Sequence, residues 1–368
     1  MNTITQLDTT QTDQERDAFT MRMLDATTGV FDIYTIHIGY RLGFYTALAR
    51  GASLTSTALA GLTGTYERYV REWLEQQTVA GIVRVENADA PAGERRFFLP
   101  AGHIEVLTDR ESVNFLAPLA QLVVGAVRPV ADVIEAFKSG AGVPYSRYGE
   151  DMRDGVGLLN RTMFMQQLGR EWLPGIPDIH GRLTANPHAR VADIGCGQGW
   201  SSIGMALAYP HIRVDGYDLD EPSVARARIN ARQAGLIGRV NFHVRDASDP
   251  IHKKTYDLVT AFECIHDMPD PVGVLTAMRQ MAAETGSVVI LDERTAERFS
   301  PDDSGIDGLF YGFSVMACLP NGMAEQPSAQ TGTVMRPETL KQYALAAGFA
   351  GMEILPVEHF FFRLYRLF

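Results

Sequence analysis

The sequence predicts an α/β protein, with a mostly parallel sheet in the second half of the chain and a largely helical first half. Two observations predict the sheet. From residue 190 onward short apolar strands alternate with helices, and this alternation places parallel strands in one sheet with helices on both faces. A glycine-containing turn at residues 195–199 joins the first of these strands directly to a helix. Before residue 190, apolar residues recur chiefly at helical spacing.

Composition and charge limit the kinds of protein that this chain can be. With 368 residues and 46% hydrophobic content, the chain is long enough for two domains with separate cores. The formal net charge of -11 gives no general attraction to nucleic acid or to an anionic membrane. The cysteines Cys196, Cys264 and Cys318 form no C-x-x-C pair, so neither a disulfide framework nor a cysteine metal site is predicted. We expect a cytoplasmic protein that binds no metal.

Residues 1–20 are expected to form a flexible N-terminal arm. Residues 1–16 are rich in Thr, Gln and Asp, and they lack the basic start and the apolar core of a signal peptide. No run elsewhere approaches the roughly 18 apolar residues of a membrane span, so we expect no membrane insertion.

Residues 21–110 are predicted to form a helical domain of winged-helix type. An apolar stripe at helical spacing runs from Phe31 through Ile38 to Leu48, and we expect it to be core or subunit interface. Two helices, 53–62 and 65–80, precede two short strands, 82–86 and 95–99, that flank a turn. Helix, turn, helix and hairpin in this order outline a winged helix-turn-helix.

The local charge argues against DNA binding by this domain, although winged helices often bind DNA. Between residues 53 and 106 there are five basic and seven acidic residues. Duplex binding depends mainly on neutralising phosphates, so an acidic surface is unsuited to it. We therefore predict a dimerisation domain, a homodimer, and no nucleic-acid partner.

Residues 111–185 are predicted to be a helical linker that contributes to a substrate pocket. A long apolar helix over 112–138 precedes a Gly- and Pro-containing break around 140–149, and a second helix covers 152–173. The Met and Phe side chains of the second helix could line a pocket, and plain core packing explains them equally well. A polar helix over 178–186 leads into the sheet.

The glycine turn limits the ligand at the first strand end. Its glycines, Gly195, Gly197 and Gly199, are spaced G-x-G-x-G, whereas a dinucleotide site requires G-x-G-x-x-G. Asp193 lies two residues before them, where a carboxylate would repel a pyrophosphate and attract a cation such as an amino-acid ammonium group. Both features disfavour hydride transfer with NAD, which remains the rival enzymatic hypothesis.

In these features the chain resembles the class I S-adenosylmethionine-dependent methyltransferases, whose first motif is an acid followed by G-x-G-x-G. The resemblance covers residues 190–368 and implies a catalytic domain over 186–368, with a seven-stranded Rossmann-like sheet and S-adenosylmethionine as cofactor. Two final strands, 352–357 and 359–368, are separated by one residue and suggest a hairpin. The resemblance implies that one of them is an antiparallel strand inserted into the parallel sheet.

Acids at successive strand ends are predicted to hold the cofactor, because ligands of open parallel sheets lie beyond the carboxyl ends of the strands. Asp218, after the second strand, could accept hydrogen bonds from both ribose hydroxyls, while Asp220 suits a helix N-cap. Asp246, after the third, could accept from the adenine amine. With the resemblance, the expected cofactor-binding residues are Asp193, Gly195, Cys196, Gly197, Trp200, Asp218, Leu219, Asp246, Ala247 and Phe262.

His266 and Asp267 follow the fourth strand and are the candidate catalytic residues, together with Glu293 after the fifth. A neutral imidazole suits removal of a hydroxyl proton during methyl transfer. Alternatively, His266 shapes the pocket or donates a hydrogen bond. Asp267 could orient the ring or cap the next loop, and Asp292 and Glu293 could orient the ring or the substrate.

The His-Asp pair resembles that of two-domain small-molecule O-methyltransferases, which join a winged-helix dimerisation domain to this catalytic fold. Many of those have Trp at the next position, and here it is Met268, which leaves the base role open. The segments 144–148, 309–316 and 331–333 are similar to those of actinobacterial winged-helix methyltransferases.

We therefore predict methyl transfer to a small apolar or aromatic molecule, with oxygen favoured as the acceptor atom. Nitrogen and carbon acceptors remain open, and so does a winged-helix regulator that senses S-adenosylmethionine without turning it over.

Overall fold

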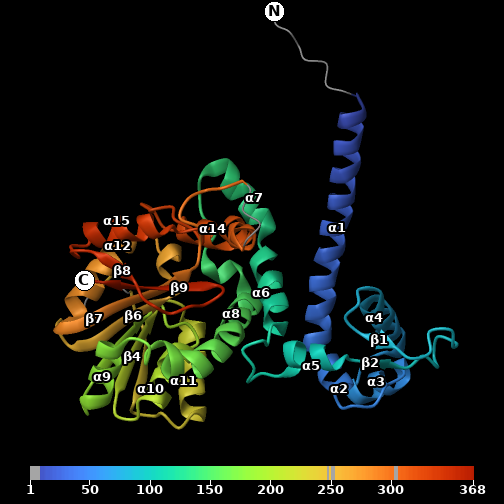
Figure 1. The fold of residues 1–368 in the computed structure, drawn as a ribbon, viewed down its shortest axis with the longest axis horizontal. Coiled ribbons are helices and arrows are strands. Elements are labelled where there is room, and N and C mark those ends of the chain that lie inside the picture. The colour runs from blue at the N-terminus through green and yellow to red at the C-terminus, as the bar shows by residue number, and fades with distance from the viewer. Residues whose placement is uncertain (1–8, 247, 250–252, 302–305) are drawn as a thin grey trace, which may run out of the picture. The chain divides into compact units, whose positions relative to one another are not determined.

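The structure is a computed structural model, and it describes residues 9–246, 248–249, 253–301 and 306–368. The chain divides into two compact units, residues 1–124 and 125–368, and the division falls within helix α6 (Ala117–Val127). Figure 1 shows the helical unit and the unit that contains the large sheet. Each unit is described by itself.

The N-terminal unit is a winged helix, as predicted. Its elements in order are α1 (Thr9–Arg41), α2 (Phe44–Leu48), α3 (Ser56–Thr63), α4 (Glu67–Val79), β1 (Arg84–Val85), β2 (Phe97–Phe98) and α5 (Ala101–Thr108). Strands β1 and β2 pair antiparallel and form the wing. The Thr55 side chain caps α3 by accepting from the Ala58 N–H, and Gly64, with φ 66°, ends that helix in the left-handed conformation. Helix α5 was not predicted.

Helix α1 is longer than the sequence pattern indicates. Residues 9–20 of the expected flexible arm lie within α1, and residues 1–8 lie outside the described residues. The apolar stripe divides between two helices, because Gly43 with φ 72° breaks the chain between α1 and α2. Phe31 and Ile38 on α1 are exposed, whereas Leu48 on α2 is buried in the core of this unit.

The second unit contains a seven-stranded sheet in the order β5-β4-β3-β6-β7-β9-β8. The strands are β3 (Arg190–Ile194), β4 (Arg213–Asp218), β5 (Val240–Val244), β6 (Tyr256–Phe262), β7 (Ala282–Glu293), β8 (Met352–Ile354) and β9 (Phe362–Leu367). Strands β3 to β7 pair in parallel, and β9 lies between β7 and β8, antiparallel to both. The predicted inserted strand is confirmed, although residues 355–361 separate β8 from β9 instead of a single residue.

Helices cover both faces of this sheet (Figure 1). On one face lie α9 (Pro177–Ala185), α10 (Trp200–Ala208) and α11 (Glu221–Gln233), and on the other α12 (Pro271–Met281) and α15 (Pro337–Ala346). Each face has its own apolar core, in which Val191 and Ile203 lie on the first side and Val259 and Leu275 on the second. The strand ends that carry the candidate site residues therefore rest on a sheet that is packed on both sides.

The predicted long helix over 112–138 is instead two helices, α6 and α7 (Val130–Ser139), bent by 50°. Pro129 lies at the bend. Proline lacks the N–H that would continue the helix, and this explains why the helix is interrupted there. Next come η1 (Tyr145–Arg147), α8 (Gly149–Met163) and the π-helix η2 (Phe164–Trp172). Later in the chain lie η3 (Ile265–Asp267), α13 (Asp307–Phe313), the π-helix η4 (Ser314–Cys318) and α14 (Leu319–Gly322).

Among the helices described, none alone is long and apolar enough to cross a membrane. The bent pair α6 and α7 passes that test only jointly, by length and composition.

Candidate functional site

The turn after β3 has three glycines in the left-handed conformation. Their φ angles are 65° at Gly195, 49° at Gly197 and 81° at Gly199, values that side chains rarely allow. A Cβ atom at Gly195 would lie 2.6 Å from Cys264 Sγ, and one at Gly199 would lie 2.4 Å from the Phe242 ring. At Gly197 no described atom outside the two neighbouring residues would lie within 4 Å of such a Cβ. The middle of the turn is therefore the position at which a ligand can approach the backbone.

Asp193 is enclosed by hydroxyl groups at the base of this turn. Its Oδ2 accepts hydrogen bonds from Ser201 and Ser202, both at 2.6 Å, and its Oδ1 accepts one from Thr260 at 2.8 Å. Thr260 lies opposite Asp193 in the sheet, which explains their contact. Burial raises the pKa of Asp193, and the hydroxyl donors oppose that effect. Asp193 thus joins the first turn of α10 to β3 and β6, and its expected contact with a ligand ammonium group stays a prediction.

Asp218, at the end of β4, links the glycine turn to the next loop. Its Oδ2 accepts from the Gly197 N–H and its Oδ1 from the Asp220 N–H, both at 2.8 Å. Burial raises the pKa of this carboxyl. Asp220 caps α11 by accepting from the Ser223 N–H, as predicted. Leu219 between them is 61% exposed, so it presents an apolar side chain at this edge.

The third strand end holds Asp246, which is exposed and accepts hydrogen bonds from the N–H and hydroxyl of Ser248 at 2.8 Å. Ala247, expected to help bind the adenine, lies outside the described residues. The adenine contact proposed for Asp246 is therefore still a prediction.

The apolar residues predicted for the site lie on different elements around the turn. Phe262, at the end of β6, is buried and stacks on Phe164 of η2 with ring centroids 5.6 Å apart. Trp200 begins α10 and lies under the Arg161 guanidinium, 5.2 Å from its ring centroid. Cys196 is buried in the core below the turn.

Helix α8 contacts the glycine turn, which the sequence analysis did not foresee. Arg153 donates two hydrogen bonds to Asp220, at 2.7 and 2.8 Å, and this ion pair is only 15% exposed on each side. The Gln198 side chain donates to Asp154 at 2.9 Å and to the Arg153 carbonyl at 3.2 Å. In the sequence, Arg153 and Asp154 look like ordinary charged residues of a helix surface. Their spacing does not distinguish them from other such residues.

His266 is a residue of η3, and three carboxylates surround its ring. Its Nδ1 donates to Asp292 Oδ1 at 3.0 Å and lies 3.2 Å from Glu293 Oε2, while its Nε2 lies 3.5 Å from Asp267 Oδ1. The structure therefore brings together all three residues predicted to be catalytic, and Asp292, which was expected to orient the ring or the substrate, contacts the ring. The ring is 2% exposed and lies behind Asp267.

Opposing effects act on the pKa values in this cluster. Burial lowers the pKa of His266, but the carboxylates of Asp292, Glu293 and Asp267 outweigh it and hold that pKa well above its usual value. Burial also raises the pKa of Glu293, against the effect of His266. The cluster therefore favours an imidazolium in the free protein, and a neutral imidazole requires a pH above its ordinary range.

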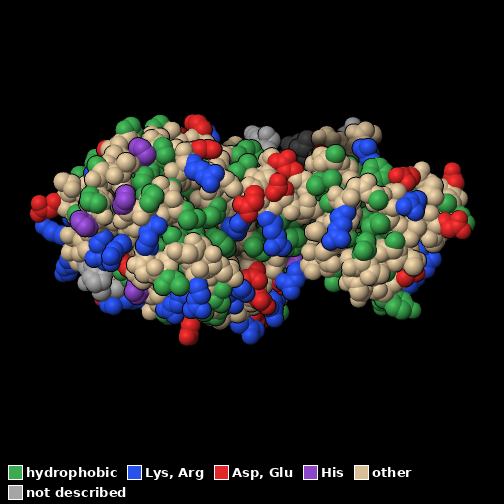
Figure 2. All heavy atoms as spheres, turned by 90° about the horizontal axis from the view of Figure 1, so that it is seen from below, with side chains coloured by type: hydrophobic (Ala, Val, Ile, Leu, Met, Phe, Trp, Pro, Cys, Tyr) green, Lys and Arg blue, Asp and Glu red, His purple; other side chains and the backbone are tan. Residues whose placement is uncertain are grey.

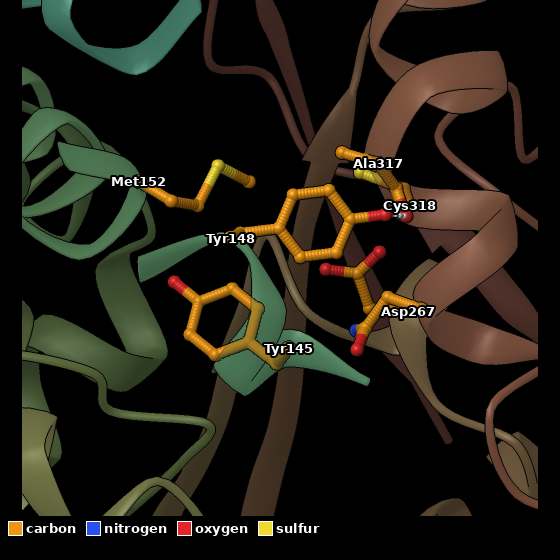
Figure 3. A pocket seen from close by; sticks show the side chains of 7 residues that line it. Tyr145, Tyr148, Met152, Asp267, Ala317 and Cys318 are labelled. Carbon is orange, nitrogen blue, oxygen red and sulfur yellow. Dashed lines mark hydrogen bonds between the residues drawn. The ribbon is translucent and has the colours of Figure 1, made fainter. Parts of the chain in front are cut away.

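A small cavity lies beside this cluster. Figure 3 shows Tyr145, Tyr148 and Met152 on one side and Asp267 and Cys318 on the other. Its empty space is about 160 Å³ even when the part open to solvent is counted. This is less than the roughly 300–1,000 Å³ of most ligand sites. As it stands, the cavity fits only a small part of an acceptor molecule.

Two segments far apart in the sequence form the walls of this cavity. The Tyr148 hydroxyl donates to the Met316 and Ala317 carbonyls, at 3.1 and 3.2 Å, and the Val143 N–H donates to the Pro320 carbonyl at 2.8 Å. The aromatic wall residues were not predicted as site residues. Their aromatic character gave a signal in the sequence, but only the fold shows that they face Asp267.

Glu263 is a further polar residue that the sequence analysis missed. It follows β6 with φ 55°, a conformation unfavourable for a side chain other than glycine, and its N–H donates to the Leu291 carbonyl at 2.8 Å. Its Oε1 is buried and has no hydrogen-bond partner among the described residues. Burial raises its pKa to about 8, against a hydrogen bond from Asn160.

Two groups around His266 bring ligand-type atoms within 4.8 Å of one another, and so could hold a metal ion. One joins His266 to Asp292 and Glu293, and the other joins it to Asp267 and Cys318. In the first group the ion pair of the imidazole with two carboxylates accounts for the arrangement by itself.

Comparisons with known protein families match both units. Residues 185–329 match the family model of a methyltransferase domain, and residues 33–109 match that of an Rv2258c-like winged HTH domain.

Similar proteins with assigned functions were found by sequence. A ubiquinone biosynthesis O-methyltransferase of Aromatoleum aromaticum is 29% identical over 172 residues, which cover 46% of this chain and 68% of that protein. One of Marinobacter nauticus is 33% identical over 105 residues, covering 27% of this chain and only 42% of that protein.

Among solved structures, human N-acetylserotonin methyltransferase in complex with S-adenosylmethionine is similar over 95% of this chain and 97% of its own, with a TM-score of 0.69. At 16% identity, this likeness shows a shared fold and nothing further.

The protein is an S-adenosylmethionine-dependent methyltransferase, as defined by the order of its strands, its glycine turn and its match to the methyltransferase domain model. The chain thus joins a methyltransferase domain to an N-terminal winged-helix domain. Its residues fit the cofactor in two respects: the space beside Gly197 is open, and the buried Glu263 oxygen lacks a partner among the described residues.

Proposed function

We propose that this protein transfers a methyl group from S-adenosylmethionine to a hydroxyl oxygen of a small molecule. The observation that carries the proposal is the His266–Asp267 pair, which lies beside a cavity with aromatic walls and is braced from behind by Asp292. Of the possible acceptor atoms, a hydroxyl oxygen has most need of a group that takes up its proton. Residues 186–368 would form the catalytic domain, and residues 111–185 would supply part of the pocket.

The bound cofactor supplies an electrophilic methyl group, so the protein must hold the acceptor in line with it and take up a proton. Gly195, Gly197 and Asp218 would hold the cofactor at the strand ends, and Asp246 would contact its adenine. Asp267 lies between His266 and the cavity, so the acceptor proton passes to the Asp267 carboxylate or to His266 Nε2. Asp292 and Glu293 then stabilise the imidazolium.

An apolar or aromatic acceptor suits the cavity walls. Tyr145, Tyr148 and Met152 offer ring faces and a thioether, and aromatic side chains pack well against planar ligands.

A matched panel of phenols and anilines tests oxygen as the acceptor. We would incubate each with the protein and S-adenosylmethionine and quantify methylated product and S-adenosylhomocysteine by mass spectrometry. Methylation of phenols, with anilines of the same ring unchanged, is the expected result. Methylation of anilines alone would show that nitrogen is the acceptor and would refute the O-methyl proposal.

His266 as a hydrogen-bond donor is the second candidate role, and it is favoured by the carboxylates that keep the ring protonated. In that role the rate of methyl transfer would fall as pH rises, whereas a base gives a rate that rises with pH. The pH profile of single-turnover transfer separates the two roles.

A regulator that binds DNA is disfavoured by the charges of the N-terminal unit. On α4, Arg68 pairs with Glu72 and Arg71 with Glu67, while Arg95 pairs with Glu75. Figure 2 shows acidic and basic side chains interspersed over this unit on the face in view. We propose instead that this unit forms a homodimer, in the cytoplasm and without nucleic acid. A gel shift at low salt, where phosphate contacts are strongest, would reveal DNA binding if this is wrong.

A further inference from the structure

Glu263 has a place in the site that the proposed reaction does not use. It immediately follows Phe262 at the end of β6, and β6 pairs with β3, which leads into the glycine turn. Its left-handed backbone is held by the hydrogen bond to Leu291 on β7. A residue that is kept in an unfavourable conformation by its neighbours is fixed in direction. The carboxyl group is thus a rigid part of the site and not a loop residue in solvent.

Among the residues that the structure describes, no cationic side chain is in hydrogen-bond contact with Glu263. Asn160 of α8 donates to it, and the charged groups that act on it from other elements are His266 and Asp267 of η3 and Asp292 and Glu293 of β7. His266 is already paired with Asp292 and Glu293. A buried carboxylate oxygen without a donor is costly, and its cost falls when a cationic ligand supplies the missing hydrogen bond.

Asp193, the acid on the neighbouring strand β3, is not available in the same way. Three hydroxyl groups already donate to its two oxygens, and it is 1% exposed. Of these two acids at the ends of β3 and β6, Glu263 is the one that can still accept a hydrogen bond. S-Adenosylmethionine carries an α-ammonium group on its methionine part, and an ammonium group is a donor of three hydrogen bonds.

We propose that Glu263 binds the α-ammonium group of S-adenosylmethionine and loses its own proton as it does so. This inference rests on the cofactor of the proposed function and is independent of the acceptor. Because the pKa of Glu263 is raised to about 8 by burial, the free protein carries this proton at neutral pH. Pairing with a cation lowers that pKa, so binding releases the proton and the affinity increases with pH up to about 8.

Titration calorimetry with two cofactor analogues tests the contact. S-Adenosylhomocysteine keeps the ammonium group, whereas 5′-methylthioadenosine lacks the amino-acid part altogether. Glu263→Gln keeps the shape of the side chain and removes its charge, and Glu297→Gln, at an exposed position, is the matched control. We expect Glu263→Gln to lower the affinity for S-adenosylhomocysteine roughly 10- to 100-fold, which is the effect of losing a charged hydrogen bond. The affinity for 5′-methylthioadenosine should not change.

Proton release is the second readout. Repeating the titration at pH 7 in buffers of different ionisation enthalpy should give close to one proton released per site for the wild-type protein and for Glu297→Gln. Glu263→Gln should release about one proton fewer.

The outcomes separate this inference from the cofactor assignment. If the wild-type protein binds no S-adenosylhomocysteine, the cofactor assignment and the inference both fail. If binding is normal but Glu263→Gln leaves affinity and proton release unchanged, only the inference fails. Equal weakening of both analogues would also overturn it, since the loss would then not depend on the ammonium group.

Discussion

At the level of single residues, the His266 ring lies between a pair of carboxylates on one side and Asp267 with the cavity on the other. Behind it, Asp292 and Glu293 hold Nδ1 and favour the protonated ring. In front of it, Asp267 separates Nε2 from the cavity. The same carboxylates that would stabilise an imidazolium after proton uptake therefore also delay the appearance of the neutral base as pH rises.

The pH dependence of methyl transfer tests whether this ring is the base. The single-turnover rate of methyl transfer should rise with pH through the raised pKa of His266, because only the neutral ring accepts a proton. His266→Ala should lower the rate about 10²- to 10⁴-fold, the usual contribution of a general base. Asp292→Asn should move the rise to lower pH, because one of the charges that raise the pKa is gone. A profile that is the same in Asp292→Asn and wild type would show that His266 is not the titrating group.

At the scale of elements, the turn between β3 and α10 is fixed by close contacts at both ends and is open in the middle. Gly195 lies against Cys264, and Gly199 lies against Phe242, whereas Gly197 faces open space. Asp193 adds hydroxyl contacts that join the start of α10 to the sheet. The turn is therefore preformed before a ligand binds.

Two alanine substitutions distinguish these positions. Gly197→Ala should lower the free energy of unfolding by about 1–2 kcal/mol, the cost of a left-handed alanine, and should weaken cofactor binding because its methyl group fills the open space. Gly199→Ala should be less stable still, because its Cβ would also overlap the Phe242 ring. Urea denaturation and calorimetry measure the two effects. Equal stability of the variants would contradict the packing described here.

Helix α8 gives a second prediction at this scale. Arg153→Ala removes the two hydrogen bonds to Asp220 and should lower the free energy of unfolding by roughly 1–3 kcal/mol, between the values for exposed and buried pairs. Burial raises the pKa of Asp220, but Arg153 and Ser223 outweigh it and lower that pKa. This part of the stability is thus present in full above the ordinary aspartate pKa, and it is lost as pH falls through the lowered pKa of Asp220.

The measurement is urea denaturation at pH 7 and again at pH 3. The difference between wild type and Arg153→Ala should shrink at the lower pH, because below the ordinary aspartate pKa the unfolded chain takes up a proton at Asp220 and the advantage of the ion pair falls. Arg170→Ala, on η2, is the control. A difference of the same size at both pH values would mean that the lost energy is packing and not the ion pair.

At the scale of the whole molecule, helix α1 leaves large apolar side chains in solvent. Phe19, Leu24 and Phe31 are 61%, 56% and 62% exposed. Exposed apolar surface on this scale is typical of a protein–protein interface. The proposed homodimer would cover it.

Light scattering after size exclusion tests the dimer. The wild-type protein should have twice the 40.5 kDa mass of the chain, and the double variant Leu24→Glu, Phe31→Glu should have the mass of a monomer. Gln11→Glu, exposed on the same helix, adds a charge without removing apolar surface and should remain dimeric. A wild-type monomer would refute the proposal.

The sequence predicted the sheet well because strand and helix periods differ and the acids follow strand ends in order. Asp218 and Asp193 meet at the turn because parallel strands end at one edge. The break at Pro129 was readable from proline chemistry and was nevertheless missed. The contact between Arg153 and Asp220 could not be predicted, because it joins segments 67 residues apart that share no period. The role of Glu263 could not be predicted either, because neither its φ angle nor the missing hydrogen-bond partner of its carboxyl can be inferred from a single sequence.

The cavity walls and the cofactor residues come from different parts of the fold. Tyr145, Met152 and Cys318 lie on helices outside the sheet, while Asp218 and Gly197 lie at its strand ends. Laboratory evolution can therefore vary Met152 and Cys318 in a focused library, whereas Tyr145 packs under Arg153, which pairs with Asp220 beside a strand end. The variants in such a library would differ first in their selectivity among acceptors. Their thermal stability and cofactor affinity would stay close to those of the parent protein.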